Sequence, residues 1–146
     1  MIKHKKILPL PQTLAHFSLS AKKSLGQHFI LDQNLTDRIA RAANVSTNDL
    51  SDFTVIEIGP GPGGLTRSIL KRKPRHLYVV ERDQRCVEAL DILRQIYTNR
   101  LTIITGDALT LSISNIGQAP RRIIANLPYN ISTILLINWL RQIKNI

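Results

Sequence analysis

The chain has 146 residues, 43% of them hydrophobic, which is enough to bury the core of about one domain. Twenty basic against ten acidic residues give a net charge of +10, which favours a polyanionic partner such as a nucleic acid over a merely basic soluble protein. A single cysteine excludes a disulfide framework, four scattered histidines predict no metal site, and no run is apolar enough to cross a membrane.

Residues 1–21 are predicted to form a basic, flexible arm before a folded part that comprises residues 22–146. The start of the chain contains no acidic residue before Asp32, and Pro9 and Pro11 interrupt its apolar run, so it is not a secretory signal. Its lysines suit phosphate contacts, and a solvated tail is the alternative. Together with the lone cysteine, this start predicts a cytoplasmic protein. An organellar matrix is the other option, although the arm lacks the arginines of a transit peptide.

The segment after the arm is predicted to turn and then enter a helix. Gly26 favours the turn, and Asp32 is placed to cap a helix in which Leu35 and Ile39 recur at helical spacing. Nothing in the pattern itself gives the residues around His28 a chemical role, so they are first read as polar loop residues.

A glycine-rich turn after a buried strand is the strongest motif in the chain. Residues 54–58 read as the strand, and Gly59, Gly61 and Gly64 fit G-x-G-x-x-G before a helix. Glycine suits such a turn because it has no Cβ and tolerates positive φ. The motif predicts a nucleotide-like ligand close to the turn, with a purely structural turn as the alternative.

Two prolines and a carboxylate narrow the class of ligand. Pro60 and Pro62 lack the backbone N–H groups with which such loops hold phosphates, which argues against a pyrophosphate and thus against a dinucleotide. Glu57, inside the strand, suits a cationic ligand. S-adenosylmethionine is a nucleoside that carries an ammonium and a sulfonium but no phosphate, so it is the predicted cofactor.

Three more strands follow, and helices alternate with them. This alternation predicts an α/β fold with a parallel sheet, right-handed crossovers and helices on both faces. Ligands bind beyond the carboxyl ends of such strands, where Gly59, Glu81, Asp107 and Asn126 all fall. The predicted strands are 77–80, 101–104 and 123–125, and the predicted helices are 84–94 and one that starts at Ser132 or Thr133.

These strand ends suggest separate roles at one site. Glu81, 22 residues after Gly59, is placed to accept both ribose hydroxyls of an adenosine moiety. Asp107 is placed to accept the exocyclic amine of the cofactor adenine. Taken singly, Glu81 could be a surface charge, and Asp107 could be part of an ordinary turn.

The sequence Asn126-Leu127-Pro128-Tyr129 suits methylation of a planar amine. The Asn126 oxygen and a backbone carbonyl near Leu127 could accept both N–H bonds and so favour a lone pair directed at the donor methyl. Pro128 fixes the turn, and Tyr129 offers a face on which a flipped-out or single-stranded base can stack. A turn with a packed tyrosine is the structural alternative.

From about residue 21 onward the chain resembles the bacterial rRNA adenine dimethyltransferases of the KsgA type. The motifs that carry the resemblance are Lys23-Ser24-Leu25-Gly26-Gln27-His28-Phe29, Glu57-Ile58-Gly59-Pro60-Gly61, Glu81, Gly106-Asp107-Ala108 and Asn126-Leu127-Pro128-Tyr129-Asn130-Ile131-Ser132. The resemblance implies a Rossmann-like methyltransferase fold and S-adenosylmethionine-dependent dimethylation of two adjacent adenines near the 3′ end of small-subunit rRNA. It also implies that His28 and Ile30, a position where the family usually has leucine, line the cofactor site along with Gly59, Glu81, Asp107 and Asn126.

The family continues with further strands and a small helical domain, so the chain is expected to be a truncated member with its fourth strand at an open edge. The resemblance implies rRNA or the precursor of the small ribosomal subunit as partner, no metal, and a monomer. Three alternatives stay open. They are a large-subunit rRNA methyltransferase of the antibiotic-resistance type, a non-catalytic RNA-binding or ribosome-assembly module with a residual cofactor pocket, and a dinucleotide-binding oxidoreductase domain.

Overall fold

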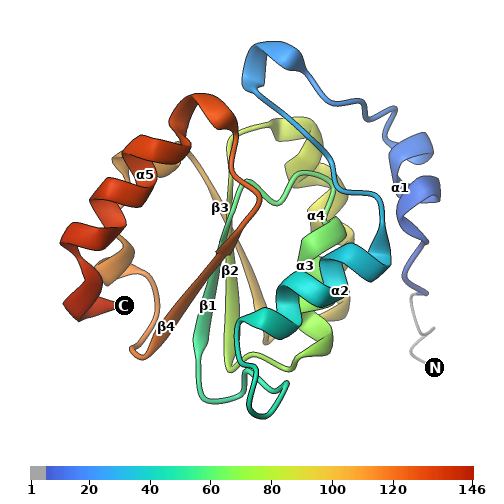
Figure 1. The fold of residues 1–146 in the computed structure, drawn as a ribbon. Helices are drawn as coiled ribbons and strands as arrows, with labels where there is room; N and C mark the ends of the chain where they lie inside the picture. Colours follow the sequence, from blue (N-terminus) through green and yellow to red (C-terminus); the bar gives the residue numbers. More distant parts are fainter. Residues whose placement is uncertain (1–5) are drawn as a thin grey trace.

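A four-stranded parallel sheet forms the centre of the computed structural model, which describes residues 6–146 (Figure 1). The strand order is β3-β2-β1-β4, so the order reverses between β1 and β4. Such a reversal opens a crevice beyond the carboxyl ends of the strands. This arrangement confirms the predicted α/β class. The strands are β1 Thr54–Ile58, β2 His76–Glu81, β3 Leu101–Thr105 and β4 Arg121–Ala125.

Helices cover both faces of the sheet, as predicted (Figure 1). One core lies between the sheet and α2, α3 and α4, and includes Val55, Ile69 and Leu90. The second lies under α5 and includes Ile56 and Leu135. Successive residues of β1 enter opposite cores because strand side chains alternate in direction. The helices are α1 Leu10–His16, α2 Gln33–Ala42, α3 Gly64–Lys71, α4 Gln84–Ile96 and α5 Tyr129–Arg141, with 3-10 turns at Lys23–Leu25, Ala108–Thr110, Ile113–Asn115 and Ile143–Asn145.

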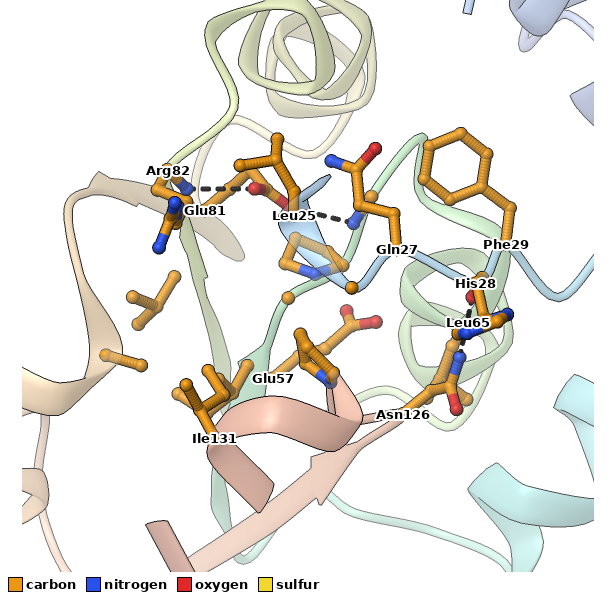
Figure 2. A pocket seen from close by; sticks show the side chains of 18 of the residues that line it. Leu25, Gln27, His28, Phe29, Glu57, Leu65, Glu81, Arg82, Asn126 and Ile131 are labelled. Atoms are coloured by element: carbon orange, nitrogen blue, oxygen red, sulfur yellow. Dashed lines mark hydrogen bonds between the residues drawn. The ribbon is translucent and has the colours of Figure 1, made fainter. Parts of the chain in front are cut away.

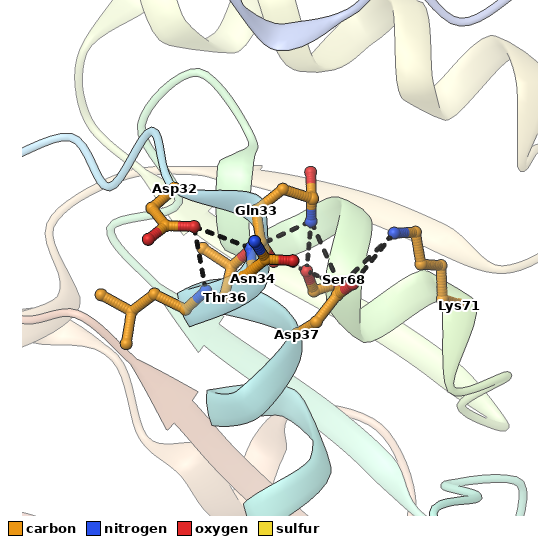
Figure 3. Close-up of polar contacts among 8 residues, drawn as sticks. Asp32, Gln33, Asn34, Thr36, Asp37, Ser68 and Lys71 are labelled. Atoms are coloured by element: carbon orange, nitrogen blue, oxygen red, sulfur yellow. Dashed lines mark hydrogen bonds and ion pairs between the residues drawn. The ribbon is translucent and has the colours of Figure 1, made fainter.

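A partly buried polar cluster joins α2 to α3 (Figure 3). Ser68 Oγ donates to Asp37 Oδ1 at 2.5 Å, Gln33 Nε2 donates to Ser68 Oγ at 2.6 Å, and Lys71 Nζ lies 3.3 Å from Asp37 Oδ2. Burial alone would raise the pKa of Asp37, but the hydrogen bonds from Ser68, Lys71 and Gln33 hold it below its usual value. The predicted cap of α2 is confirmed, because Asp32 Oδ1 accepts the backbone N–H groups of the first turn.

The N-terminal segment packs against the folded part of the chain. From residue 6 onward it runs along the folded part and contains α1, whose Leu10 and Thr13 are buried. Arg67 of α3 fixes it, donating to the Leu8 carbonyl and, at 3.0 Å, to Thr13 Oγ1. Residues 6–21, expected to form a flexible arm, thus include a helix that packs on α3, while residues 1–5 lie outside the described part of the chain.

Helix α5 begins three residues earlier than the nearer of the two predicted starts. Pro128, at φ −57°, is its N-cap, and the Pro128 carbonyl accepts the backbone N–H groups of Ile131 and Ser132. The Ser132 hydroxyl donates to the Tyr129 carbonyl within the first turn. Among the described residues β4 pairs only with β1, so the predicted open edge is confirmed.

A buried arginine at the start of β4 should matter strongly for stability. Arg121 is 7% exposed, and its guanidinium donates only to backbone carbonyls, so Arg121→Met would leave these acceptors without their charged donor. We expect the free energy of unfolding in urea to fall by about 2–4 kcal/mol. The accepting carbonyls belong to Ser114, Ile116, Gly117 and Asn145.

The adjacent arginine provides the matched control. Arg122 is exposed, and its guanidinium lies 4.0 Å from the centroid of the Phe53 ring. Arg122→Met should cost no more than about 1 kcal/mol, the value of an exposed cation–π contact. Equal losses for both variants would contradict a special role for Arg121.

Candidate active site

One pocket opens where the strands end, and it gathers seven of the nine predicted site residues. The empty space of the pocket, counted together with the open solvent at its mouth, is about 840 Å³. Figure 2 shows Glu81 and Asn126 on opposite sides, with Glu57 between them. The predicted residues that line the pocket are His28, Ile30, Gly59, Glu81, Asp107, Asn126 and Pro128.

The other two predicted residues lie beside the pocket. Leu127 packs against the core under α5. Tyr129 is 80% exposed at the start of α5, and its ring lies against His28 rather than against the pocket floor. This placement leaves the tyrosine face open at the mouth of the site.

The glycine-rich turn is shaped for close approach. Gly59 has φ +66°, in the left-handed region that other residues avoid. A Cβ on Gly64 would lie 2.6 Å from the carbonyl oxygen of Ile30, so the segment before α2 packs directly on the turn. Residues 25–30 and the turn thereby form adjoining walls of the pocket.

Glu57 is a buried carboxyl group at the base of the pocket. It is 1% exposed, and its only hydrogen bond among the described residues comes from the Thr66 hydroxyl, at 2.6 Å from Oε2. Burial raises its pKa to about 8, the Thr66 hydrogen bond opposes that rise, and the nearby Glu81 adds to it. The group is therefore largely protonated at neutral pH and is poised to ionise beside a cation.

Glu81 is held in place by the backbone around it. Oε1 accepts the N–H groups of Arg82 and Asp83, each at 2.9 Å, and Oε2 accepts that of Gly61 at 3.0 Å. Burial raises its pKa, and these three hydrogen bonds counteract the rise. A carboxylate offers about four acceptor positions, so this arrangement leaves one, on Oε2, for a ribose hydroxyl. Acceptance of both hydroxyls would require one backbone hydrogen bond to give way.

The end of β3 forms the third wall. Asp107 caps the following 3-10 turn, its Oδ1 accepting the Leu109 N–H at 2.9 Å. A Cβ built on Gly106 would meet no atom within 4 Å, so this position faces open space at the pocket. Ala108 and Val80 add apolar surface there.

Asn126 reaches across to the segment before α2. Its Nδ2 donates to the His28 carbonyl at 2.8 Å, which leaves Oδ1 as the acceptor for another group (Figure 2). The His28 and Tyr129 rings are 5.1 Å apart at an interplanar angle of 52°. The three predicted residues thus form one small group at the mouth of the pocket.

The sequence carried only weak signals for two residues that support the site. Thr66, the partner of Glu57, lies nine positions after it, on the first turn of α3. Gln27 donates to Asp83 Oδ2 at 2.8 Å across 56 positions of sequence, a pairing that no local pattern reveals. The resemblance had included Gln27 in a motif without assigning it a role.

The described residues contain no cluster of three or more histidine, cysteine, aspartate or glutamate side chains that could hold a metal ion. Within the same part of the chain, no helix is long and apolar enough to cross a membrane.

Known proteins match both the sequence and the fold. The chain is 52% identical over 134 residues to Ribosomal RNA small subunit methyltransferase A of Paramagnetospirillum magneticum and 50% identical over 134 residues to that of Rhodospirillum rubrum. These matches cover 92% of this chain but 46% and 45% of the relatives, so the chain spans about half their length.

The crystal structure of the 23S rRNA methyltransferase ErmE superposes with a TM-score of 0.65 at 27% identity, covering 77% of this chain and 43% of that one. This likeness agrees with the Rossmann-like methyltransferase fold predicted from the sequence. A family model described as ribosomal RNA adenine dimethylase matches residues 18–145. The chain therefore belongs to the ribosomal RNA adenine dimethylase family.

Proposed function

We propose that this chain carries the cofactor site and the amine-binding loop of an enzyme that transfers methyl groups from S-adenosylmethionine to adenine amino groups of small-subunit rRNA. The observation that carries the proposal is the Asn126 side chain at the pocket mouth, whose nitrogen is engaged by the His28 carbonyl and whose oxygen can accept an N–H. Because the chain spans about half of its relatives, activity, substrate and partner are all part of this proposal.

The residues of the pocket fit S-adenosylmethionine. The prolines of the turn offer no N–H to a phosphate, and the buried carboxyl of Glu57 suits the cationic part of the cofactor. Glu81 would hold the ribose and Asp107 the adenine amine, with Gly59, Ile30 and the backbone of His28 along the wall. When bound, the cofactor supplies an electrophilic methyl group on its sulfonium.

The chain itself would orient the target. The Asn126 oxygen and the backbone carbonyl at Leu127 would accept the two N–H bonds of an adenine amine and so favour a lone pair directed into the pocket. The open face of Tyr129 would stack the base, which must be flipped out or single-stranded to reach it. The contribution of the chain to catalysis would be to position the amine for attack on the methyl group, and no covalent nucleophile is required.

Small-subunit rRNA is favoured over large-subunit rRNA because the relatives at about 50% identity are named as small-subunit enzymes, whereas the 23S rRNA enzyme is 27% identical. Two adjacent adenines near the 3′ end of that RNA are the proposed target, and a cytoplasmic monomer is the proposed form. A non-catalytic RNA-binding module with a residual pocket is the second candidate.

Calorimetric titration of the 146-residue chain with S-adenosylmethionine, with NADH as control, tests the proposal first. We expect saturable binding of the methyl donor alone, followed by methyl incorporation into small-subunit rRNA. Binding without incorporation would favour the non-catalytic module. A folded chain without binding would reject the cofactor site.

Two glycines should separate cofactor binding from stability. In Gly106→Ala the added Cβ meets no protein atom but enters the pocket, so we expect S-adenosylmethionine affinity to fall about tenfold or more with an unchanged unfolding midpoint. Gly117 has φ +60°, and its Cβ would lie 2.6 Å from Thr54 Cγ2, away from the pocket. Gly117→Ala should therefore lower the unfolding midpoint and leave the affinity of the folded fraction unchanged. The reverse pattern would contradict the placement of the cofactor beside Gly106.

A further inference from the structure

We propose that His28 is a positioning residue for the target base: its carbonyl fixes the Asn126 amide, its ring supports Tyr129, and Gln27 ties this segment to the start of α4. The inference rests on the proposed function and deepens it, because it assigns the alignment of the base to residues 22–30. It gives the His28 side chain a role on the substrate side, in place of the cofactor contact that the family resemblance implies.

The carbonyl contact decides which end of the Asn126 amide faces the substrate. Asn126 is exposed, so its amide could otherwise present either its oxygen or its nitrogen. With Nδ2 donating to the His28 carbonyl at 2.8 Å, Oδ1 faces the other way. An adenine amine is a donor, so only this orientation offers it an acceptor.

The ring contact limits the motion of an otherwise unsupported tyrosine. Tyr129 is 80% exposed, and the His28 ring, 5.1 Å away, is its only ring partner among residues 6–146. That separation is within the range of favourable aromatic pairs, about 4.5–7 Å. The histidine therefore backs the tyrosine while leaving it room to stack a base.

Gln27 anchors the same segment at its other side. Its Nε2 donates to Asp83 Oδ2 at 2.8 Å, and its Oε1 accepts the Lys22 N–H at 2.9 Å, which closes the loop that precedes His28. Asp83 is 8% exposed, caps α4 and is paired with Arg85 at 2.6 Å, so it is a firm attachment point.

Close packing joins the segment to the amine-binding loop. A Cβ on Gly26 would lie 2.9 Å from Asn130 Oδ1 and 3.2 Å from Pro128 Cβ. Residues 22–30 therefore bridge the carboxyl end of β2, where Glu81 lies, to that of β4, which Asn126 follows (Figure 2). A displacement of Gln27 should therefore change the positions of Asn126 and Tyr129.

A double-mutant cycle of His28→Ala and Tyr129→Ala tests the ring contact through methylation kinetics on RNA. We expect His28→Ala to lower kcat/KM for RNA about fivefold to tenfold in the native background and less than twofold in the Tyr129→Ala background, because interacting residues are not additive. His28→Phe should restore most of the loss, and S-adenosylmethionine affinity should change less than threefold. Additive effects, or a loss confined to cofactor affinity, would overturn the proposal.

His16→Ala is the matched control, because His16 is also exposed and its ring lies 4.8 Å from that of Phe17 in the N-terminal region. It should leave RNA kinetics unchanged.

A measurement that needs no RNA separates this inference from the proposed function. The NMR signals of the Asn126 side-chain amide and the Tyr129 ring should shift in Gln27→Ala but not in Gln84→Ala, an exposed glutamine next to Asp83. Shifts in a chain that transfers no methyl groups would reject the proposed function and retain the positioning contacts. Unchanged signals in Gln27→Ala would overturn the role of Gln27.

Discussion

Replacing Asn126 by alanine is expected to lower kcat for methyl transfer to rRNA by about 10²–10³-fold, similar to the loss of one preorganised hydrogen-bonding group in other active sites. The Asn126 oxygen is the side-chain acceptor that the pocket mouth offers to an amine, and its nitrogen already engages the His28 carbonyl. Binding of S-adenosylmethionine, measured by calorimetry, should change little because the other strand ends supply the rest of the pocket.

Two further substitutions sharpen the result. Asn126→Asp keeps an acceptor oxygen but loses the donor to His28, so its loss should be smaller than that of the alanine variant. Asn138 lies further along α5, outside the pocket, and Asn138→Ala should lower kcat no more than about threefold. An Asn126→Ala enzyme with full activity would contradict the proposed mechanism, and one that fails to bind the cofactor would assign Asn126 to the cofactor site instead.

Much of the site could be predicted because its residues belong to patterns that are short in the sequence. Buried strands and glycine turns are local features, and in a parallel sheet all strands end on the same side. Glu81, Asp107 and Asn126 could therefore be placed together without a three-dimensional structure. The glycine turn was likewise identified from its spacing alone.

The features that were missed depend on contacts between distant parts of the chain. The order of α1 follows from Arg67, more than 50 positions later, and the role of Gln27 from Asp83. Helix α5 starts early because the ring of Pro128 fixes its φ, here −57°, close to helical values, and its carbonyl accepts the N–H groups of Ile131 and Ser132. The limited acceptor capacity of Glu81 comes from three backbone N–H groups, which a sequence pattern does not reveal.

A second large effect is expected from pH, acting through Glu57. Its pKa in the folded chain is about 8 against 4.5 ordinarily, so between these values the folded state holds a proton that the unfolded state has lost. The contribution of Glu57 to the free energy of unfolding is therefore greatest below about pH 4.5. It falls as the pH rises toward 8, by at most about 1.4 kcal/mol per pH unit. The free energy of unfolding in urea, measured at several pH values, should fall with pH more steeply for the native chain than for Glu57→Gln, because the amide does not titrate.

Cofactor binding should depend on pH in the opposite direction. A cationic ligand favours ionised Glu57, so S-adenosylmethionine should release a proton from it on binding, and affinity should rise between about pH 6 and 8 by up to about tenfold per unit. Calorimetry in two buffers of different ionisation enthalpy would count the protons released. In Glu57→Gln the Thr66 hydroxyl can still donate to the side-chain oxygen, while the released proton and the steep slope should disappear.

The Gln variant also provides the reference for the ligand, because the α-amino group of the free cofactor titrates near pH 8 in both experiments. The difference between native chain and Glu57→Gln therefore reports Glu57 and its effect on the bound ammonium. Parallel affinity profiles would show that Glu57 stays protonated with the cofactor bound. In that case its role would be to support α3 through Thr66, and the positive charge of the cofactor would be met elsewhere in the pocket.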